Sequence, residues 1–389
     1  MTAPSQTFKD ALAELVAIPS VSSVDPALDM SNQPIVDHLA NWLGDLGFRI
    51  EQHDVPGQAG KVNLIARAGP DAAGAGLVLS GHTDTVPYDE TGWDSDPFTL
   101  TEKNGRLYGL GSSDMKSFFP VITEVVRELD LGRLRQPLTV LATADEESNM
   151  HGARALVDSG VALGGQALIG EPTGLQPVYM HKGVMMAAIR LIGRAGHSSD
   201  PALGENALEG MHAVIRALLD WRDELQAEHI NTDFRVPVPT LNLGRIHGGD
   251  NPNRICASCE LGIDLRPLPG MDVGELKTEL RQRVAAAVAD LNLELEFRES
   301  FDGVAAMQTP REAEVVRVAE QLSGQTAGSV AFGTEGPYLN ALGMDTVVLG
   351  AGDIAVAHQS NEYVPLDRIV PMQRIVDGMI RHFCMEQSQ

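Results

Sequence analysis

Imidazole and carboxylate side chains follow four short apolar segments of this sequence, each at the point where the segment ends. They are His82 and Asp84 after 76–80, Asp145, Glu146 and Glu147 after 137–144, Glu171 after 166–170, and His358 after 346–350. Asp114, in the segment YGLGSSDMK, stands at the start of a predicted helix. In an open parallel sheet, binding sites lie beyond the carboxyl ends of the strands. We therefore expect these side chains to gather at one edge of a sheet.

The chemistry of these side chains is typical of a divalent-metal site. Imidazole and carboxylate ligands without a thiolate suit zinc, cobalt or manganese. A catalytic zinc ion usually has three protein ligands and a water, and the present set is larger. Two ions about 3.5–4 Å apart that share a carboxylate would use the whole set. Of the neighbours Glu146 and Glu147, one could then bind metal while the other accepts a proton from water.

Each of these signals has a simpler interpretation when it is taken alone. A histidine two positions before an aspartate, as at His82 and Asp84, commonly forms a hydrogen-bonded turn. Three acids in a row, as at 145–147, are typical of an exposed cluster or of a helix N-terminus. The segment GEPTG, which contains Glu171, is typical of a turn. The prediction of a metal site depends on the occurrence of all these features after successive strands.

The segments around these residues alternate between strand and helix patterns. Short apolar runs predict strands at 62–66, 76–80, 137–144, 166–170 and 346–350, and helical spacing predicts helices at 8–18, 33–48, 117–129, 311–324 and 366–384. This alternation is typical of a mostly parallel, doubly wound α/β sheet.

Residues 181–299 have a different pattern. Longer strands are predicted at 184–193, 240–246, 255–267 and 293–300, and helices at 205–225 and 274–291. The order β-α-β-β-α-β is that of a ferredoxin-like α+β domain. We therefore expect a catalytic domain formed by residues 1–180 and 300–389, with a second domain inserted at 181–299.

The composition argues against several classes of partner. The formal net charge is −24 and no cluster of Lys and Arg interrupts it, so nucleic acid and anionic membranes would be repelled. No apolar run approaches the ~20 residues that cross a bilayer, and a signal-peptide pattern is missing, which predicts a cytoplasmic protein. Cys256 and Cys259 form a CxxC without a second pair; with Cys384, they are interpreted as reduced structural residues.

Five motifs in the order GHTDTVP, YGLGSSDMK, DEE, GEPTG and GRAGHSS carry a resemblance to a known family. Over nearly its whole length the chain resembles the dinuclear-zinc aminoacylase and peptidase family. The resemblance implies two bound divalent ions, Zn²⁺ or Co²⁺, and the following ligands: His82, Asp114, Glu147, Glu171 and His358. It also implies that Asp114 bridges the ions and is followed by a cis peptide bond.

The resemblance implies roles for three further residues. Glu146 is expected to be the general base, and Asp84 to hold the ring of His82 in the correct tautomer. His197, in the motif GRAGHSS, is expected to stabilise the oxyanion, commonly in the active site of a partner subunit. A turn or capping role is the alternative for His197. The family also implies a homodimer that forms through the inserted domain.

The implied reaction is the hydrolysis of N-acetyl-L-ornithine to acetate and L-ornithine, a step towards arginine. Arg254 and Arg266, with the adjacent Asn253, could bind the substrate carboxylate, or the arginines could be ordinary ion-pair residues. Thr334 could add a contact, and Glu335 could pair with the δ-ammonium group on grounds of charge.

Two other functions stay open at this point. One is a related N-acyl amino acid hydrolase, such as one that acts on succinyl-diaminopimelate. The other is a non-catalytic metal- or ligand-binding relative with the same fold. The segment FGTEGPYL departs from the family pattern at Gly336 and Tyr338, where Ala and Phe are expected, and this departure concerns the predicted substrate site.

Overall fold

A computed structural model of the protein describes residues 4–72, 74–298 and 302–385. The chain divides into two compact units. The first comprises the described residues up to 180 with 308–328 and those from 334 onwards; the second comprises the described residues of 181–307 and 329–333. Within the described residues, none of the helices combines the length and the hydropathy needed to cross a bilayer.

A nine-stranded sheet with a parallel centre runs through the first unit. Its strands are, in order, β1 (Arg49–Asp54), β2 (Val62–Ala68), β6 (Leu138–Thr143), β3 (Leu77–His82), β7 (Gln166–Ile169), β15 (Asp345–Val348), β8 (Val178–His181) and β13 (Met307–Gln308), with β14 (Gly328–Val330) paired to β8. The strands β6, β3, β7 and β15 are parallel, whereas β1, β2 and β8 pair antiparallel with their neighbours. The predicted mostly parallel sheet is therefore confirmed for the central strands.

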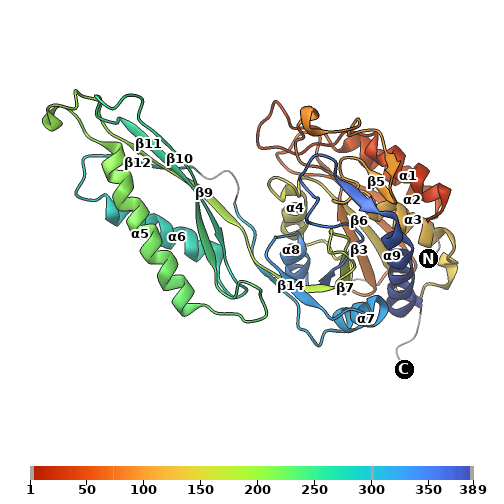
Figure 1. The fold of residues 1–389 in the computed structure, drawn as a ribbon. Coiled ribbons are helices and arrows are strands. Elements are labelled where there is room, and N and C mark those ends of the chain that lie inside the picture. Colours follow the sequence, from red (N-terminus) through yellow and green to blue (C-terminus); the bar gives the residue numbers. More distant parts are fainter. Residues whose placement is uncertain (1–3, 73, 299–301, 386–389) are drawn as a thin grey trace. The chain divides into compact units, whose positions relative to one another are not determined.

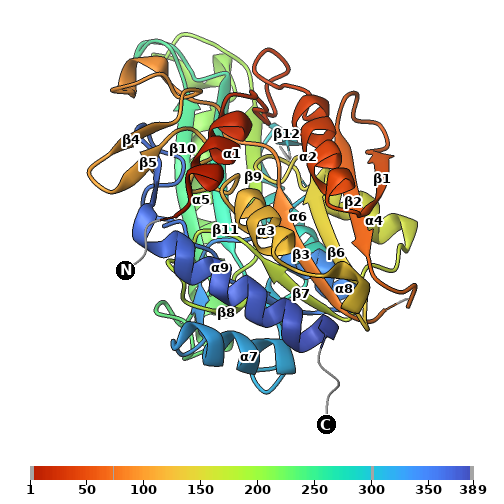
Figure 2. The same cartoon turned by 90° about the vertical axis from the view of Figure 1, so that its right-hand side faces the viewer.

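Helices cover both faces of this sheet (Figure 1). One face carries α1 (Gln6–Val16), α2 (Gln33–Asp45), α3 (Phe118–Arg127), α7 (Glu314–Ser323) and α9 (Leu366–Ile380), and the other carries α4 (His151–Ser159) and α8 (Gly336–Ala341). The turned view of Figure 2 shows α3 and α9 in front of β3. Because both faces are covered, every residue of β3 and β6 is buried, and both strands are rich in apolar residues.

A small antiparallel sheet joins two distant segments of the first unit. It consists of β4 (Thr101–Lys103), β5 (Arg106–Tyr108) and β16 (Tyr363–Pro365), in the order β16-β5-β4. Tyr363 pairs with Tyr108, so the residues just before β16 lie beside those just after β5. The sequence patterns did not predict these strands of three residues, which are too short to show alternation.

The second unit is a four-stranded antiparallel sheet with two helices on one face. Its elements are β9 (Met185–Ile192), α5 (Ala207–Glu228), β10 (Thr240–Gly248), β11 (Ser258–Arg266), α6 (Val273–Ala287) and β12 (Glu294–Arg298). The sheet order β10-β11-β9-β12 confirms the predicted ferredoxin-like plan. The predicted strand 293–300 reaches Arg298, and residues 299 and 300 lie outside the described residues.

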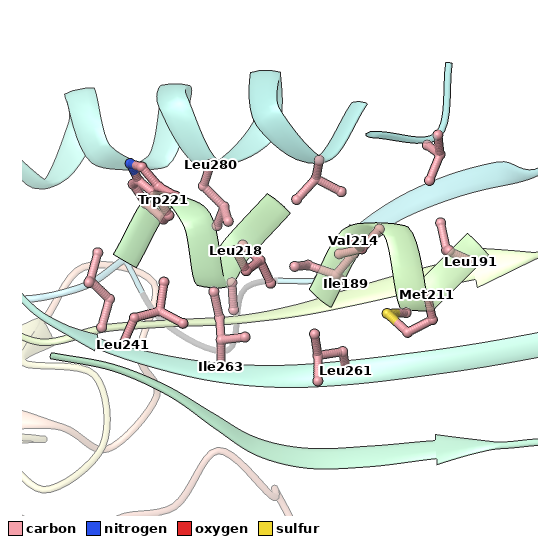
Figure 3. Packing of buried hydrophobic residues seen from close by; sticks show 14 of the residues in the cluster. Ile189, Leu191, Met211, Val214, Leu218, Trp221, Leu241, Leu261, Ile263 and Leu280 are labelled. Carbon is pink, nitrogen blue, oxygen red and sulfur yellow. The ribbon is translucent and has the colours of Figure 1, made fainter. Parts of the chain in front are cut away.

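Alternating residues of these strands form the core of the second unit. Ile189 of β9 and Ile263 of β11 point toward α5, where Val214 and Leu218 meet them (Figure 3). Trp221 of α5 is fully buried in the same cluster. Because successive strand residues face opposite sides, this pattern leaves the other face of the sheet more exposed.

The second unit extends past the boundary predicted at residue 299. Val184 and Val304 exchange two backbone hydrogen bonds of 2.8 Å, which tie the chain after residue 302 to the start of β9. Ser329 Oγ donates a hydrogen bond of 2.7 Å to the Asp233 carbonyl, and residues 329–333 belong to this unit as well.

The three cysteines are free, and Cys259 and Cys384 are buried.

Candidate metal centre

Parallel pairing of β6, β3, β7 and β15 places the carboxyl ends of these strands at one edge of the sheet. His82 is the last residue of β3, the segment 145–147 follows β6, and Glu171 follows β7. A glycine is required before Glu171, because a Cβ atom at Gly170 would lie 2.1 Å from Cγ of Phe118. The topology therefore delivers the predicted ligands to one place, with His358 supplied by the segment between β15 and β16.

Asp114 lies between the two histidines. Its Oδ1 is 3.0 Å from Nε2 of His82, and its Oδ2 is 3.5 Å from Nε2 of His358. On either side, Glu171 Oε1 is 3.6 Å from His82 Nε2 and Glu147 Oε2 is 2.8 Å from His358 Nε2. The five predicted ligands therefore form two adjacent groups that share one carboxylate, and a cis peptide bond joins Asp114 to Met115.

The electrostatics of these groups fit positively charged ions. Burial, with repulsion from neighbouring carboxylates, raises the pKa values of Glu146, Glu147 and Glu171. Hydrogen bonds to Asp114 and Glu147 raise the pKa of His358 to about 11. Glu171 Oε1 is buried and has no hydrogen-bond partner in the described structure. Buried carboxylates are costly unless they are paired or coordinate a metal, and these oxygens and imidazoles are suitable ligands.

The ring of His82 is oriented by a main-chain group. Its Nδ1 lies 3.0 Å from the carbonyl oxygen of Asp84, which can only accept a hydrogen bond. Nδ1 therefore carries the proton, and the lone pair of Nε2 faces the cluster. This role was expected of the Asp84 carboxylate. That carboxylate is 3.8 Å from Nδ1 and accepts the backbone N–H groups of Glu146 and Glu147 at 3.3 and 3.0 Å, so it holds both acids in place.

Asp145 faces away from this cluster into a network of its own. Its carboxylate accepts hydrogen bonds from Ser22 Oγ at 2.7 Å and His151 Nδ1 at 2.8 Å. Lys61 Nζ is 3.0 Å from the same carboxylate and is 97 % buried. Despite burial, these donors lower the pKa of Asp145. Asp145 therefore anchors the turn that carries Glu146 and Glu147 and does not belong to the candidate ligands.

Glu362 is a further buried acid of this region, and it was not predicted from the sequence. Its carboxylate accepts the backbone N–H groups of Gly111, Ser113 and Asp114 at 3.0, 2.8 and 2.9 Å. Burial, with repulsion from Asp114, raises the pKa of Glu362 to about 8 even though these hydrogen bonds lower it. The only signal in the sequence was its position four residues after His358.

The predicted substrate contacts at 334–335 are interior residues. Glu335 is 1 % exposed, and its carboxylate accepts hydrogen bonds from the hydroxyl groups of Ser80 and Thr143, on β3 and β6. Thr334 is fully buried, and its Oγ1 accepts the N–H of Gly336 at 3.0 Å. The δ-ammonium contact suggested for Glu335 is therefore withdrawn, because both oxygens are engaged beneath the sheet edge and away from solvent.

His197, Asn253 and Arg254 gather in the second unit. His197 forms an isolated β-bridge with Arg254, and the Asn253 carbonyl accepts the N–H of Ser198 at 3.1 Å. The N–H of Ser199 donates to Nδ1 of His197 at 3.2 Å. A ring that accepts at Nδ1 carries its proton on Nε2 when neutral, so His197 presents an N–H donor on its exposed side.

Both predicted carboxylate-binding arginines already have acidic partners. Arg254 pairs with Asp250. Arg266, at the opposite end of β11 from Ser258, forms a bidentate pair with Asp264, with Nε–Oδ1 and Nη2–Oδ2 distances of 2.8 and 3.0 Å. A substrate carboxylate would have to compete with these aspartates.

Comparisons with known proteins identify relatives of this chain. The chain is 47% identical over 370 residues to an acetylornithine deacetylase of Edwardsiella ictaluri (strain 93-146), a match that covers 95% of this chain and 96% of that protein. Its fold is similar to those of an M20 family metallo-carboxypeptidase from Sulfolobus solfataricus (TM-score 0.77, 18% identity, 98% and 99% of the two chains) and a tripeptidase from Staphylococcus aureus (0.75, 19%, 98% and 99%).

The ligand-bearing strand ends and the loop that contains His358 both lie within the part of the chain that a family model matches. This model, described as peptidase family M20/M25/M40, matches residues 78–382. The match covers well over half of the chain and spans both units. The chain therefore belongs to peptidase family M20/M25/M40.

Proposed function

We propose that this chain is an acetylornithine deacetylase, a metal-dependent amide hydrolase that converts N-acetyl-L-ornithine and water to L-ornithine and acetate. The observation that carries the chemistry is the placement of Asp114 between His82 and His358, with Glu146 beside the cluster. The choice of substrate is supported by the relative that shares 47% of its residues over nearly the full length of both proteins.

Two divalent ions, Zn²⁺ or Co²⁺, would be held by this chain's own residues. His82, Asp114 and Glu171 offer ligands to one, and His358, Asp114 and Glu147 to the other. When bound, such ions polarise an acyl carbonyl and lower the pKa of a water molecule. Three protein ligands are usual for a catalytic zinc ion, so this division leaves Glu146 available for proton transfer.

Glu146 serves as general base and then as general acid. Its carboxylate accepts a proton from the attacking water as the new C–O bond forms at the acetyl carbon. It then gives that proton to the nitrogen of ornithine as the C–N bond breaks, so that acetate and the free amine leave. Burial raises the pKa of Glu146 above its ordinary value, towards neutral pH, where a general base is most effective.

The second unit supplies the groups that recognise the substrate in this proposal. His197 presents the Nε2–H that would donate to the oxyanion, and Arg254 or Arg266, with Asn253, would bind the substrate carboxylate. Substitution of either arginine by methionine should raise KM for free-acid substrates more than for their amides. Equal effects on both would remove that arginine from carboxylate recognition.

The assembly and location are parts of the same proposal. The second unit would act as a lid and form the interface of a homodimer, and the enzyme would work in the cytoplasm. These statements are supported by the family resemblance, and light scattering and cell fractionation would test them.

The decisive experiment is a metal-dependent substrate panel. Purified protein is treated with a chelator, reloaded with Co²⁺ or Zn²⁺, and supplied with N-acetyl-L-ornithine, N-succinyl-diaminopimelate and N-acetyl amino acids of other classes. Ornithine release that disappears on chelation and returns with metal is expected, with the highest kcat/KM for N-acetyl-L-ornithine. A preference for another acyl amino acid would overturn the substrate assignment, and full activity without metal would overturn the mechanism.

A further inference from the structure

Glu362 connects the two segments that carry Asp114 and His358. The pairing of β5 with β16 places the residues after Tyr108 beside those before Tyr363. The ladder continues beyond the strands, because the N–H of Gly109 donates to the carbonyl of Glu362 at 3.1 Å. Glu362 therefore lies where the paired strands β5 and β16 end and the two chain segments continue into the loops that carry Asp114 and His358.

The Glu362 carboxylate organises the loop that ends at Asp114. Oε1 accepts the N–H groups of Ser113 and Asp114, and Oε2 accepts that of Gly111. Hydrogen bonds from backbone N–H groups to a carboxylate are stronger than neutral ones. One of these N–H groups belongs to Asp114, so the hydrogen bonds fix the backbone from which the Asp114 carboxylate extends.

Glu362 is buried without a direct ion pair in the described structure, although the buried ammonium group of Lys116 interacts with it electrostatically. Glu362 is 2 % exposed, and no Lys, Arg or His of the described residues forms an ion pair with it. A buried, unpaired carboxylate costs stability, and a purely structural loop could be held by neutral groups. Both oxygens of Glu362 accept backbone N–H groups, whereas an amide offers one acceptor atom, so an amide at this position could not hold all three N–H groups.

We propose that Glu362 is a positioning residue for the metal centre: it fixes the Asp114 carboxylate relative to His358 and thereby sets the affinity of the ion that these two residues share. This inference rests on the proposed two-ion site. The ion shared by His82 and Glu171 depends less on Glu362, because the ends of the central strands β3 and β7 hold those two ligands.

The test is a titration of the metal-free protein with Co²⁺. Binding is monitored by calorimetry and by the visible absorption of the bound ion. In Glu362→Gln, the new NH₂ group must face at least one of the three backbone donors, whichever way the amide is turned. We expect the weaker Co²⁺ equivalent to lose 10–100-fold in affinity and its spectrum to change, while the tighter equivalent changes much less.

Two further variants make the result specific. Glu362→Asp keeps the charge but is one methylene shorter, and we expect an intermediate loss; it also decides the question if the Gln variant does not fold. Glu320→Gln is the control, because Glu320 likewise accepts a backbone N–H, that of Ala327 at 2.8 Å, within the first unit. It should bind both ions as the unchanged protein does.

Opposite outcomes are equally clear. Two Co²⁺ equivalents of unchanged affinity and spectrum in both Glu362 variants would overturn the positioning role, and so would an equal loss at both sites together with a lower melting temperature of the metal-free protein. If the unchanged protein bound no Co²⁺ at all, the proposed function itself would fail. The two failures are therefore distinguishable.

Discussion

Replacement of Glu146 by glutamine is the sharpest test of the proposed chemistry. The substitution keeps the shape of the side chain and removes its ability to accept and carry a proton. The backbone at this position is held from outside, because the Asp84 carboxylate accepts the N–H groups of both Glu146 and Glu147. The variant should therefore retain the turn, the position of Glu147 and both bound ions.

The size of the effect follows from the role of the group. General acid–base catalysis by a positioned side chain contributes roughly 10²–10⁴-fold to the rate. At about 1.4 kcal/mol for each factor of ten, this corresponds to about 3–5 kcal/mol of activation free energy. We expect kcat of Glu146→Gln to fall by this factor, with little change in KM, because the proton transfer occurs in the chemical step and not on binding.

The assay combines two measurements on the same samples: kcat for ornithine release and the metal content after dialysis. Glu147→Gln is the matched control, since Glu147 lies 2.8 Å from Nε2 of His358 and should lose metal as well as activity. If Glu146→Gln turned over at the normal rate, the base would be another group. If it lost metal as Glu147→Gln does, Glu146 would be a ligand, in line with its place beside His82 and Glu171.

Three further predictions address stability. Burial lowers the pKa of His181 to about 4, so between pH 6.5 and 4 the unfolded chain binds more protons than the folded chain. About 2 kcal/mol of the free energy of unfolding should therefore be lost as the pH falls to 5. His181→Gln should remove this pH dependence, measured by urea unfolding. Trp221→Ala should cost about 3–5 kcal/mol by cavity formation, whereas Trp221→Phe should cost much less, because the buried indole N–H has no partner in the described structure. Co²⁺ at 100 times its Kd should stabilise the chelated protein by about 2.7 kcal/mol, and an unchanged melting temperature would contradict a preformed site.

The edge of the sheet where the chemistry lies could be predicted from the sequence because the signal is topological. A run such as 76–80 is apolar on both faces only if helices cover both sides, and parallel strands of this kind end at a common edge. Residues placed directly after such runs, as His82 and Glu171 are, inherit that position. The ferredoxin-like unit could also be predicted, since four long alternating strands and two long helices in this order are compatible with few other folds.

The acids behind the site could not be predicted in the same way. Glu335 and Glu362 stand in irregular segments, where no periodicity distinguishes a buried residue from an exposed one. A charge argument favoured substrate binding for Glu335, but the structure places its carboxylate against the hydroxyl groups of Ser80 and Thr143. The contact that orients His82 was missed for a related reason, because it comes from a backbone carbonyl, which every residue has.

These buried polar groups have a common physical origin. Loops that carry ligands at the end of a covered sheet are themselves partly buried, so their backbone N–H and C=O groups need partners that water cannot supply. Lys116 illustrates the point: its Nζ donates to the carbonyls of Leu15 and Ile18 at 3.1 and 2.8 Å, in the chain that leads from α1 to the site. Glu362 does the same for three N–H groups near Asp114. Lys and Glu side chains are suited to this task because each can satisfy several backbone groups at once. Because Glu362 alone accepts three N–H groups, a single substitution there should displace Asp114, although Glu362 need not contact a metal ion.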